Sequence, residues 1–182
     1  MTKITAGFRY LVVSIAFIFT LGLTACHNPA PPPTQNLEPH PLTPYEHSLV
    51  SDIQSAGAQV IKQGEVMQIV MPADTFFYTT SWKLRHRELT TIHRIASLVK
   101  SYTSRYQRPR IIVAGYTDTV FAKTAALQIS KHMASTIAAH LWDKGVPHRW
   151  ISIKAYGAKN PIASNQTSRG AAKNRRVVIK IN

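Results

Sequence analysis

Seven of the eleven prolines in this chain of 182 residues fall within the sixteen positions from Pro29 to Pro44. Proline lacks a backbone N–H donor, fixes its own φ and disfavours the helical conformation of the residue before it. Residues 28–47 are therefore expected to be extended, with neither a helix nor a central strand. About twenty such residues reach up to roughly 60 Å. A packed domain must follow this segment, and the residues before it form a separate unit.

The residues before the proline-rich segment have the pattern of a secretory signal. Lys3 and Arg9 supply positive charge, and residues 10–23 are an uncharged run of 14, short for a membrane span but suitable for a signal peptide. The run leads into Leu-Thr-Ala-Cys, which resembles the bacterial lipobox and places the single cysteine, Cys26, at the cleavage point. We expect acyl chains such as palmitate on this thiol, and more than one chain gives stable anchoring. An ordinary signal peptide or an uncleaved anchor is the alternative.

The expected cellular location limits the possible partners. His27 follows the cysteine, where an aspartate favours inner-membrane retention in bacterial lipoproteins, so the sequence resembles those sorted to the outer membrane. We predict a signal peptide at 1–25, a lipidated proline-rich tether at 26–49 and a periplasmic domain at 50–182. A disordered segment or a docking peptide for an SH3-like partner is the alternative for the tether. The formal net charge of +14 suits anionic polymers, membranes or acidic proteins, but this location argues against nucleic acid.

The remaining residues alternate between strand and helix patterns. Apolar residues recur at helical spacing in 86–102 and 123–144, and Gly145 is the expected residue just beyond the second helix. Strands are predicted at 58–71 (one or two, around Gly64), 110–116, 150–156 and 176–181. This order predicts an α+β or α/β sandwich, with helices covering one face of a mixed sheet.

No catalytic or metal-binding set is visible in the sequence. One cysteine excludes an internal disulfide and a cysteine-based zinc site. The helical histidine pairs, His86 with His93 and His132 with His140, are two turns apart, which is too far for shared ligation at i,i+4. Eight acidic residues supply few acid–base pairs, and the sequence lacks a P-loop or a nucleophile motif. We predict neither an enzyme nor a cofactor.

Two polar stretches are more informative. Gly-Tyr-Thr-Asp at 115–118 follows a buried strand, and Asn-Gln-Thr-Ser-Arg-Gly-Ala-Ala-Lys-Asn-Arg-Arg-Val at 165–177 leads into the last strand. Taken alone, each stretch can be explained as a turn with solvent-exposed polar side chains. Their order and spacing resemble the OmpA-like (OmpA C-terminal, Pal-related) peptidoglycan-associated domain over about residues 60–181. The resemblance implies an α+β, OmpA-like β/α sandwich with a mixed sheet of four or so strands and two main helices on one face.

The resemblance also implies a noncovalent site for the peptidoglycan stem peptide, whose diaminopimelate ends in an ammonium and a carboxylate. Asp118 matches the family's ammonium-binding aspartate, and Thr117, Asn174, Arg175 and Arg176 are the other candidates. Met133 occupies the position of the family's carboxylate-binding arginine. Losing one partner of a charge-assisted pair costs roughly tenfold to a hundredfold in affinity. Phe121 and Ala171 also depart from the pattern, and Lys131, Arg175 or Arg176 are the possible replacements for the missing arginine.

The expected role is therefore structural. The leading prediction is an outer-membrane lipoprotein with a degenerate peptidoglycan-associating domain. It would contact other envelope proteins as a structural component of an envelope-spanning type IV secretion assembly. The reason is that a small, degenerate, lipid-anchored member of this family is similar to a lipoprotein of Dot/Icm type IVB systems. The alternative is a Pal-like tether with an intact site. Residues 83–110 carry eight Lys and Arg against one acid, Glu88. This basic stretch is either a solvated helix face or a contact surface for an anionic polymer, lipid or partner.

Overall fold

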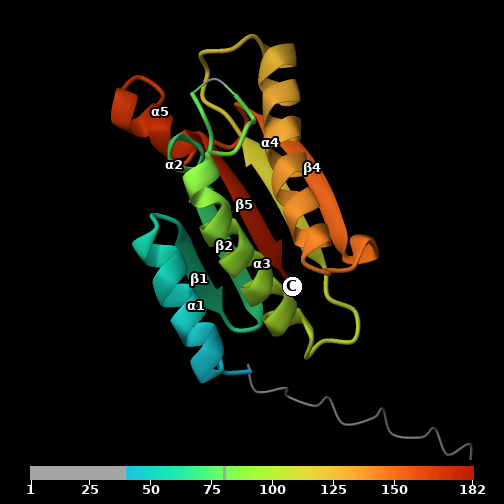
Figure 1. Cartoon of the computed structure of the whole chain (residues 1–182). Coiled ribbons are helices and arrows are strands. Elements are labelled where there is room, and N and C mark those ends of the chain that lie inside the picture. The colour runs from blue at the N-terminus through green and yellow to red at the C-terminus, as the bar shows by residue number, and fades with distance from the viewer. Residues whose placement is uncertain (1–39, 80) are drawn as a thin grey trace, which may run out of the picture. The chain divides into compact units, whose positions relative to one another are not determined.

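The computed structural model describes residues 40–79 and 81–182 (Figure 1). The predicted signal peptide, Cys26 and most of the tether lie outside these residues and stay predictions. Among the described residues, no helix combines the length and apolar character that crossing a bilayer requires.

A five-stranded mixed sheet forms the centre of the domain, in the order β1-β2-β5-β3-β4. Neighbouring strands are antiparallel except β3 and β4, which are parallel. The fifth strand arises because residues 58–71 form a hairpin around Gly64, whose φ is 57°. The strands are β1 (Gln59–Gln63), β2 (Val66–Pro72), β3 (Ile111–Tyr116), β4 (Ile151–Gly157) and β5 (Arg176–Ile181).

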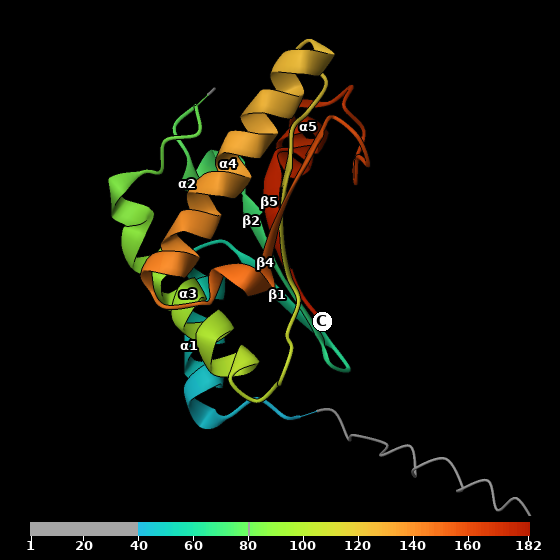
Figure 2. The same ribbon diagram turned by 90° about the vertical axis from the view of Figure 1, so that its right-hand side faces the viewer.

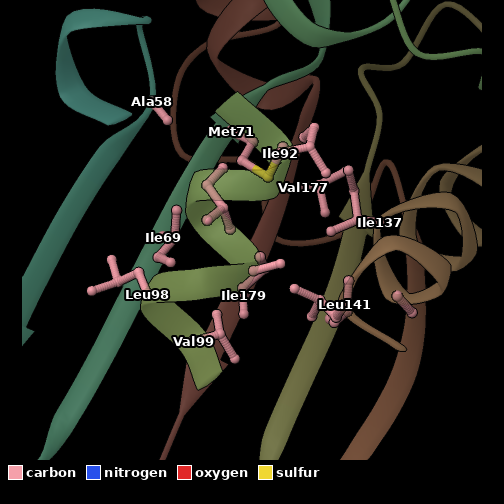
Figure 3. Close-up of a cluster of buried hydrophobic side chains, with 14 of the residues drawn as sticks. Ala58, Ile69, Met71, Ile92, Leu98, Val99, Ile137, Leu141, Val177 and Ile179 are labelled. Carbon is pink, nitrogen blue, oxygen red and sulfur yellow. The ribbon is translucent and has the colours of Figure 1, made fainter. Parts of the chain in front are cut away.

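Three helices cover one face of this sheet: α1 (Pro44–Ser55), α3 (Leu89–Thr103) and α4 (Lys123–Asp143) (Figures 1 and 2). Two short helices, α2 (Ala73–Phe76) and α5 (Ser168–Asn174), lie at the ends of β2 and β5, and 3-10 turns at His86–Glu88 and His148–Trp150 precede α3 and β4. The core is the layer between sheet and helices, where Figure 3 shows Ile69, Met71, Val177, Ile179, Ile92, Val99, Ile137 and Leu141. The α+β fold class, the mixed sheet and the two longest helices agree with the predictions.

Helix α1 corrects the sequence prediction for the end of the proline-rich segment. That segment was expected to be extended through His47, but α1 begins at Pro44. Proline is tolerated at the first helical position, because its missing N–H would have no partner there. Thr43 caps the helix in a capping box: its hydroxyl accepts from the N–H of Glu46, and the Glu46 carboxylate accepts from the N–H of Thr43. Helix α1 therefore begins within residues 26–49, which were predicted to be the tether.

A close contact between α4 and β3 sets the position of the 115–118 motif. A Cβ atom on Gly115 would lie 2.0 Å from the carbonyl oxygen of Ser130, so only glycine fits at this point of the strand. The Ser130 hydroxyl accepts a 3.0 Å hydrogen bond from the N–H of Gly157, which ties α4 to the end of β4. Residues 117 and 118 therefore leave the sheet directly beside α4.

Candidate functional site: a cleft at the end of strand β3

A cleft of about 460 Å³ opens where β3 ends, beside α2, α4 and the start of β5. This volume lies within the usual range for small-ligand pockets. Among the residues that line it are Asp74, Arg85, Thr117, Asp118, Met133 and Arg175. Three of the five candidates from the sequence, Thr117, Asp118 and Arg175, are therefore brought together by the fold.

Arg175 is shared between two carboxylates in this cleft. Its Nε donates to Asp74 Oδ1 at 2.8 Å and its Nη2 to Asp74 Oδ2 at 2.5 Å, which is a bidentate pair. Its Nη1 donates to Asp118 Oδ2. The hydrogen bonds from Arg175 to Asp74, and then to Asp118, raise the pKa of the guanidinium despite its partial burial. Two carboxylates and one guanidinium leave the cluster with one net negative charge.

The turn after β3 orients Asp118 and Thr117. Asp118 Oδ1 accepts a 3.2 Å hydrogen bond from the N–H of Val120, and the N–H of Thr117 donates to the carbonyl of Gly157 at 2.8 Å. Thr117 is only 4% exposed, and its hydroxyl oxygen is buried without a hydrogen-bond partner in the described part of the chain. Buried polar groups are nearly always hydrogen-bonded, so an unpartnered hydroxyl in a cleft points to a ligand or water.

Met133 forms part of the apolar side of the cleft. It lies on α4 with 3% of its surface exposed, belongs to the hydrophobic core and lines the cleft together with Ile129. A thioether is only a weak hydrogen-bond acceptor and cannot hold a carboxylate. Lys131, on the same helix, is absent from the residues that line the cleft, so it does not replace the missing arginine.

Asn174 and Arg176, the other two candidates, serve the framework. The Asn174 side-chain oxygen accepts from the N–H groups of Ile162 and Ala163 at 2.8 and 3.0 Å, which holds the loop after β4. Arg176 lies 3.8 Å above the Tyr116 ring and donates to the backbone carbonyls of Asn174 and Asn160. Burial lowers the pKa of Arg176. Neither residue lines the cleft: Asn174 ends α5 and Arg176 begins β5, and of the three adjacent residues only Arg175, between the two elements, is among the lining residues.

Arg85 is a cleft residue that the sequence analysis missed as part of the site. The sequence placed it in the basic stretch 83–110, without any motif to distinguish it from its neighbours. Its Nε donates to the carbonyl of Phe77 at 2.9 Å, and its Cζ lies 5.3 Å above the Tyr78 ring. A helical wheel could not have found it, because it precedes α3 in a loop whose path depends on tertiary contacts.

The basic stretch is partly neutralised within the domain. Arg105 pairs with Glu46, Arg94 pairs with Asp52, and Arg87 pairs with the adjacent Glu88. Two of these carboxylates come from α1, which the sequence analysis did not predict. The stretch therefore presents less free positive charge than its composition suggests. In the described part of the chain, no group of three or more His, Cys, Asp or Glu side chains could hold a metal ion.

Comparison with known proteins identifies the family. Residues 76–175 match the OmpA family, and this match covers more than half of the chain. The chain therefore belongs to the OmpA family. The probable lipoprotein YiaD of Escherichia coli is 30% identical over 136 residues, which are 75% of this chain and 60% of that protein. The outer-membrane lipoprotein YfiB of Pseudomonas aeruginosa is 23% identical over 171 residues, which are 94% and 92% of the two chains.

Solved structures show the same fold. The cell wall anchor of the type VI secretion system from Pseudomonas aeruginosa has a TM-score of 0.63 and 21% identity, with 79% of this chain and 97% of that chain covered. The chain spans 60% of the length of YiaD and 57% of the outer membrane protein A of Bordetella avium. These findings confirm the predicted family. They do not support the more specific resemblance to DotK, the lipoprotein of Dot/Icm systems, and they do not establish a secretion role.

Proposed function

We propose that this protein is an outer-membrane lipoprotein whose OmpA-like domain binds peptidoglycan noncovalently on the periplasmic side, with the diaminopimelate end of a stem peptide in the cleft. One observation carries the proposal. The same cleft is lined by Asp118 and by Thr117. Asp118 shares the guanidinium of Arg175 with Asp74, and the buried Thr117 hydroxyl has no partner among the described residues. The relative named peptidoglycan-binding protein ArfA, from Mycobacterium tuberculosis, supports it at 35% identity over 91 residues.

The charges of the cluster formed by Asp74, Arg175 and Asp118 suit an ammonium group. Asp74 and Asp118 together carry one more negative charge than Arg175 neutralises. An ammonium with three donors can bind between carboxylate oxygens and the Thr117 hydroxyl oxygen. Asp118 is almost fully buried, and hydrogen bonds to a charged group are stronger than those between neutral groups. We therefore assign ammonium recognition to Asp118, with Thr117 as a second acceptor.

Binding to purified sacculi tests this proposal. The full chain is incubated with sacculi at about 0.15 M salt, and the retained fraction is compared with that of Asp118→Ala. We expect the wild-type protein to be retained and the variant to be released, because the ammonium loses its charged acceptor. Asp52→Ala is the matched control, since Asp52 is an exposed carboxylate on α1, paired with Arg94, far along the chain from the cleft motif. Equal retention of wild type and Asp118→Ala would contradict the assignment.

The lipid anchor is a further part of the proposal. Cys26 lies outside the described residues, and the outer-membrane lipoprotein YfiB, which aligns with nearly the whole chain, supports an anchored protein. Cys26→Ser is expected to remove the protein from the outer-membrane fraction of cell extracts, because the serine can be neither acylated nor processed as a lipoprotein. Mass spectrometry of the wild-type protein should find acyl chains on Cys26, and an unmodified thiol would disprove the anchor.

The second candidate is a structural component of an envelope-spanning assembly, such as a type IV secretion system, held by protein contacts. Met133 favours it, because the family's carboxylate-binding arginine is absent and an apolar side chain occupies its place in the cleft. The sacculus experiment separates the two candidates. If wild-type protein is not retained at physiological salt, the assembly role is favoured over the tether.

A further inference from the structure

Arg85 lies on the rim of the cleft, and the loop after α2 forms this rim. This rim loop, residues 77–79 and 81–85, contributes Phe77, Tyr78 and Arg85 to the cleft lining. It lies beside α4 in both views (Figures 1 and 2), where the Trp82 ring stacks on His132 at 4.6 Å. Its base is closed by a bridge between Phe77 and Leu84 and by a hydrogen bond from the N–H of Arg85 to the carbonyl of Phe76. The fold thus holds the backbone of Arg85 in place.

The two arginines of the cleft differ in how their nitrogens are used. Arg175 commits Nε, Nη1 and Nη2 to the carboxylates of Asp74 and Asp118. Arg85 commits Nε to the carbonyl of Phe77, and within residues 40–79 and 81–182 its two terminal nitrogens have no hydrogen-bond acceptor. The Tyr78 ring beneath its Cζ supports the guanidinium plane. Arg85 is therefore the cleft cation that is both held in place and free to bind an anion.

We propose that Arg85 binds the carboxylate of the ligand and so replaces, from a different element of the fold, the arginine that is absent at Met133. This inference rests on the proposed function. An anionic pair of aspartates on one side and a free guanidinium on the rim make the cleft complementary to a zwitterion, and Met133 and Ile129 provide an apolar side that fits a methylene chain. The ligand class is an amino-acid end group that carries both an ammonium and a free carboxylate.

The test compares two soluble stem peptides on the full chain in detergent. One ends in meso-diaminopimelate with its side-chain carboxylate free, and the other has that carboxylate amidated. Dissociation constants are measured by calorimetry for wild type, Arg85→Gln, Asp118→Asn and the matched control Lys83→Gln. Lys83 is an exposed cation of the same loop that does not line the cleft, so Lys83→Gln removes the same charge without removing the contact.

We expect Arg85→Gln to weaken binding of the free-acid peptide roughly tenfold to a hundredfold, because a charge-assisted hydrogen bond is lost. Lys83→Gln should change it less than about threefold, since exposed charges in solvent interact weakly. The amidated peptide should bind wild type and Arg85→Gln equally.

Each other outcome overturns the inference. If Arg85→Gln and Lys83→Gln bind the free-acid peptide with the same dissociation constant while Asp118→Asn abolishes binding, Arg85 does not bind the carboxylate, although the proposed function stands. If Arg85→Gln weakens both peptides equally, its effect is on the loop and not on the carboxylate. If wild type binds neither peptide, the proposed function fails as well.

Discussion

Two arginine–carboxylate clusters in this domain show how the same chemistry can serve structure or binding. In the first, Glu46 of α1 is fully buried, and its carboxylate accepts from Ser101 of α3, from Arg105 just beyond the end of α3 and from the N–H of Thr43. In the second, Asp118 is also almost fully buried, and its guanidinium partner Arg175 is about as exposed as Arg105 but is shared with the half-exposed Asp74. One carboxylate is enclosed by its own chain, and the other faces a cleft.

The difference lies in what surrounds the pair. Glu46 and Arg105 join two packed helices, and Arg105 also lies over the Tyr102 ring of α3. The Asp118 pair lines a cleft together with Thr117, whose hydroxyl has no partner in the described chain. Each cluster includes one buried atom without a partner among the described residues, but Arg105 Nε lies beside packed helices, whereas Thr117, which carries the unpartnered hydroxyl, lines a cleft that a ligand can enter. Stability and binding should therefore respond differently to changes in the two clusters.

The largest effect on stability is expected from Glu46→Ala. Removing one partner of a fully buried ion pair costs about 3–5 kcal/mol of the free energy of unfolding, and because Arg105 is 24% exposed the loss should lie at the lower end, about 3 kcal/mol. Urea unfolding at pH 7 measures it. Asp52→Ala, which removes the exposed partner of Arg94 on the same helix, should cost less than about 1 kcal/mol. Similar losses for the two variants would contradict the structural role of Glu46.

The opposite response is expected from Asp118→Asn. Arg175 keeps its bidentate pair with Asp74, so the free energy of unfolding should change by less than about 1.5 kcal/mol. Affinity for the stem peptide should fall roughly tenfold to a hundredfold. Peptide titration and urea unfolding of one preparation test both statements. A large loss in the free energy of unfolding with unchanged peptide affinity would reverse the distinction between the clusters.

A smaller effect is expected from pH at a site next to the first cluster. Although partial burial opposes it, hydrogen bonds from the Tyr106 hydroxyl and the N–H of His40 lower the pKa of Glu65 below its ordinary value of 4.5. A carboxyl whose pKa is depressed by folding stabilises the protein above its unfolded pKa, and this contribution is lost as the pH falls through its folded pKa. Wild type should therefore lose stability below about pH 4.5 more steeply than Glu65→Gln. Thermal melts from pH 6 to pH 3 measure the two slopes, and parallel curves would contradict the assignment.

The smallest effect is expected from Thr117→Val. Valine matches the shape of threonine and removes the buried hydroxyl that has no partner among the described residues, so the domain should become more stable by up to about 1 kcal/mol. Peptide affinity should decrease at the same time if this hydroxyl contacts the ligand. Thermal melts and peptide titrations measure the two changes. Lower stability would mean that the hydroxyl serves the fold.

The sequence by itself determined the local elements and the family. Helical spacing in residues 123–144 and alternation in 150–156 correspond to observed elements, because periodicity reflects which side chains face the core, and Gly64 lies at an observed turn between two strands. The motif at 115–118 also located Thr117 and Asp118, since the residues after a buried strand are positioned by that strand. These features depend on neighbours close in the chain.

Tertiary structure decided what the sequence could not. Helix α1 is stabilised by Arg105, 59 residues away from Glu46, so the proline content of its surroundings gave the wrong prediction. Arg175 and Arg176 are adjacent in sequence, yet Arg175, in the junction between α5 and β5, lines the cleft, whereas Arg176, the first residue of β5, stacks on Tyr116 of the neighbouring strand β3. Arg85 enters the site through a loop that packs on α4. Contacts between residues far apart in the chain assemble the charges of the cleft, and no local pattern records them.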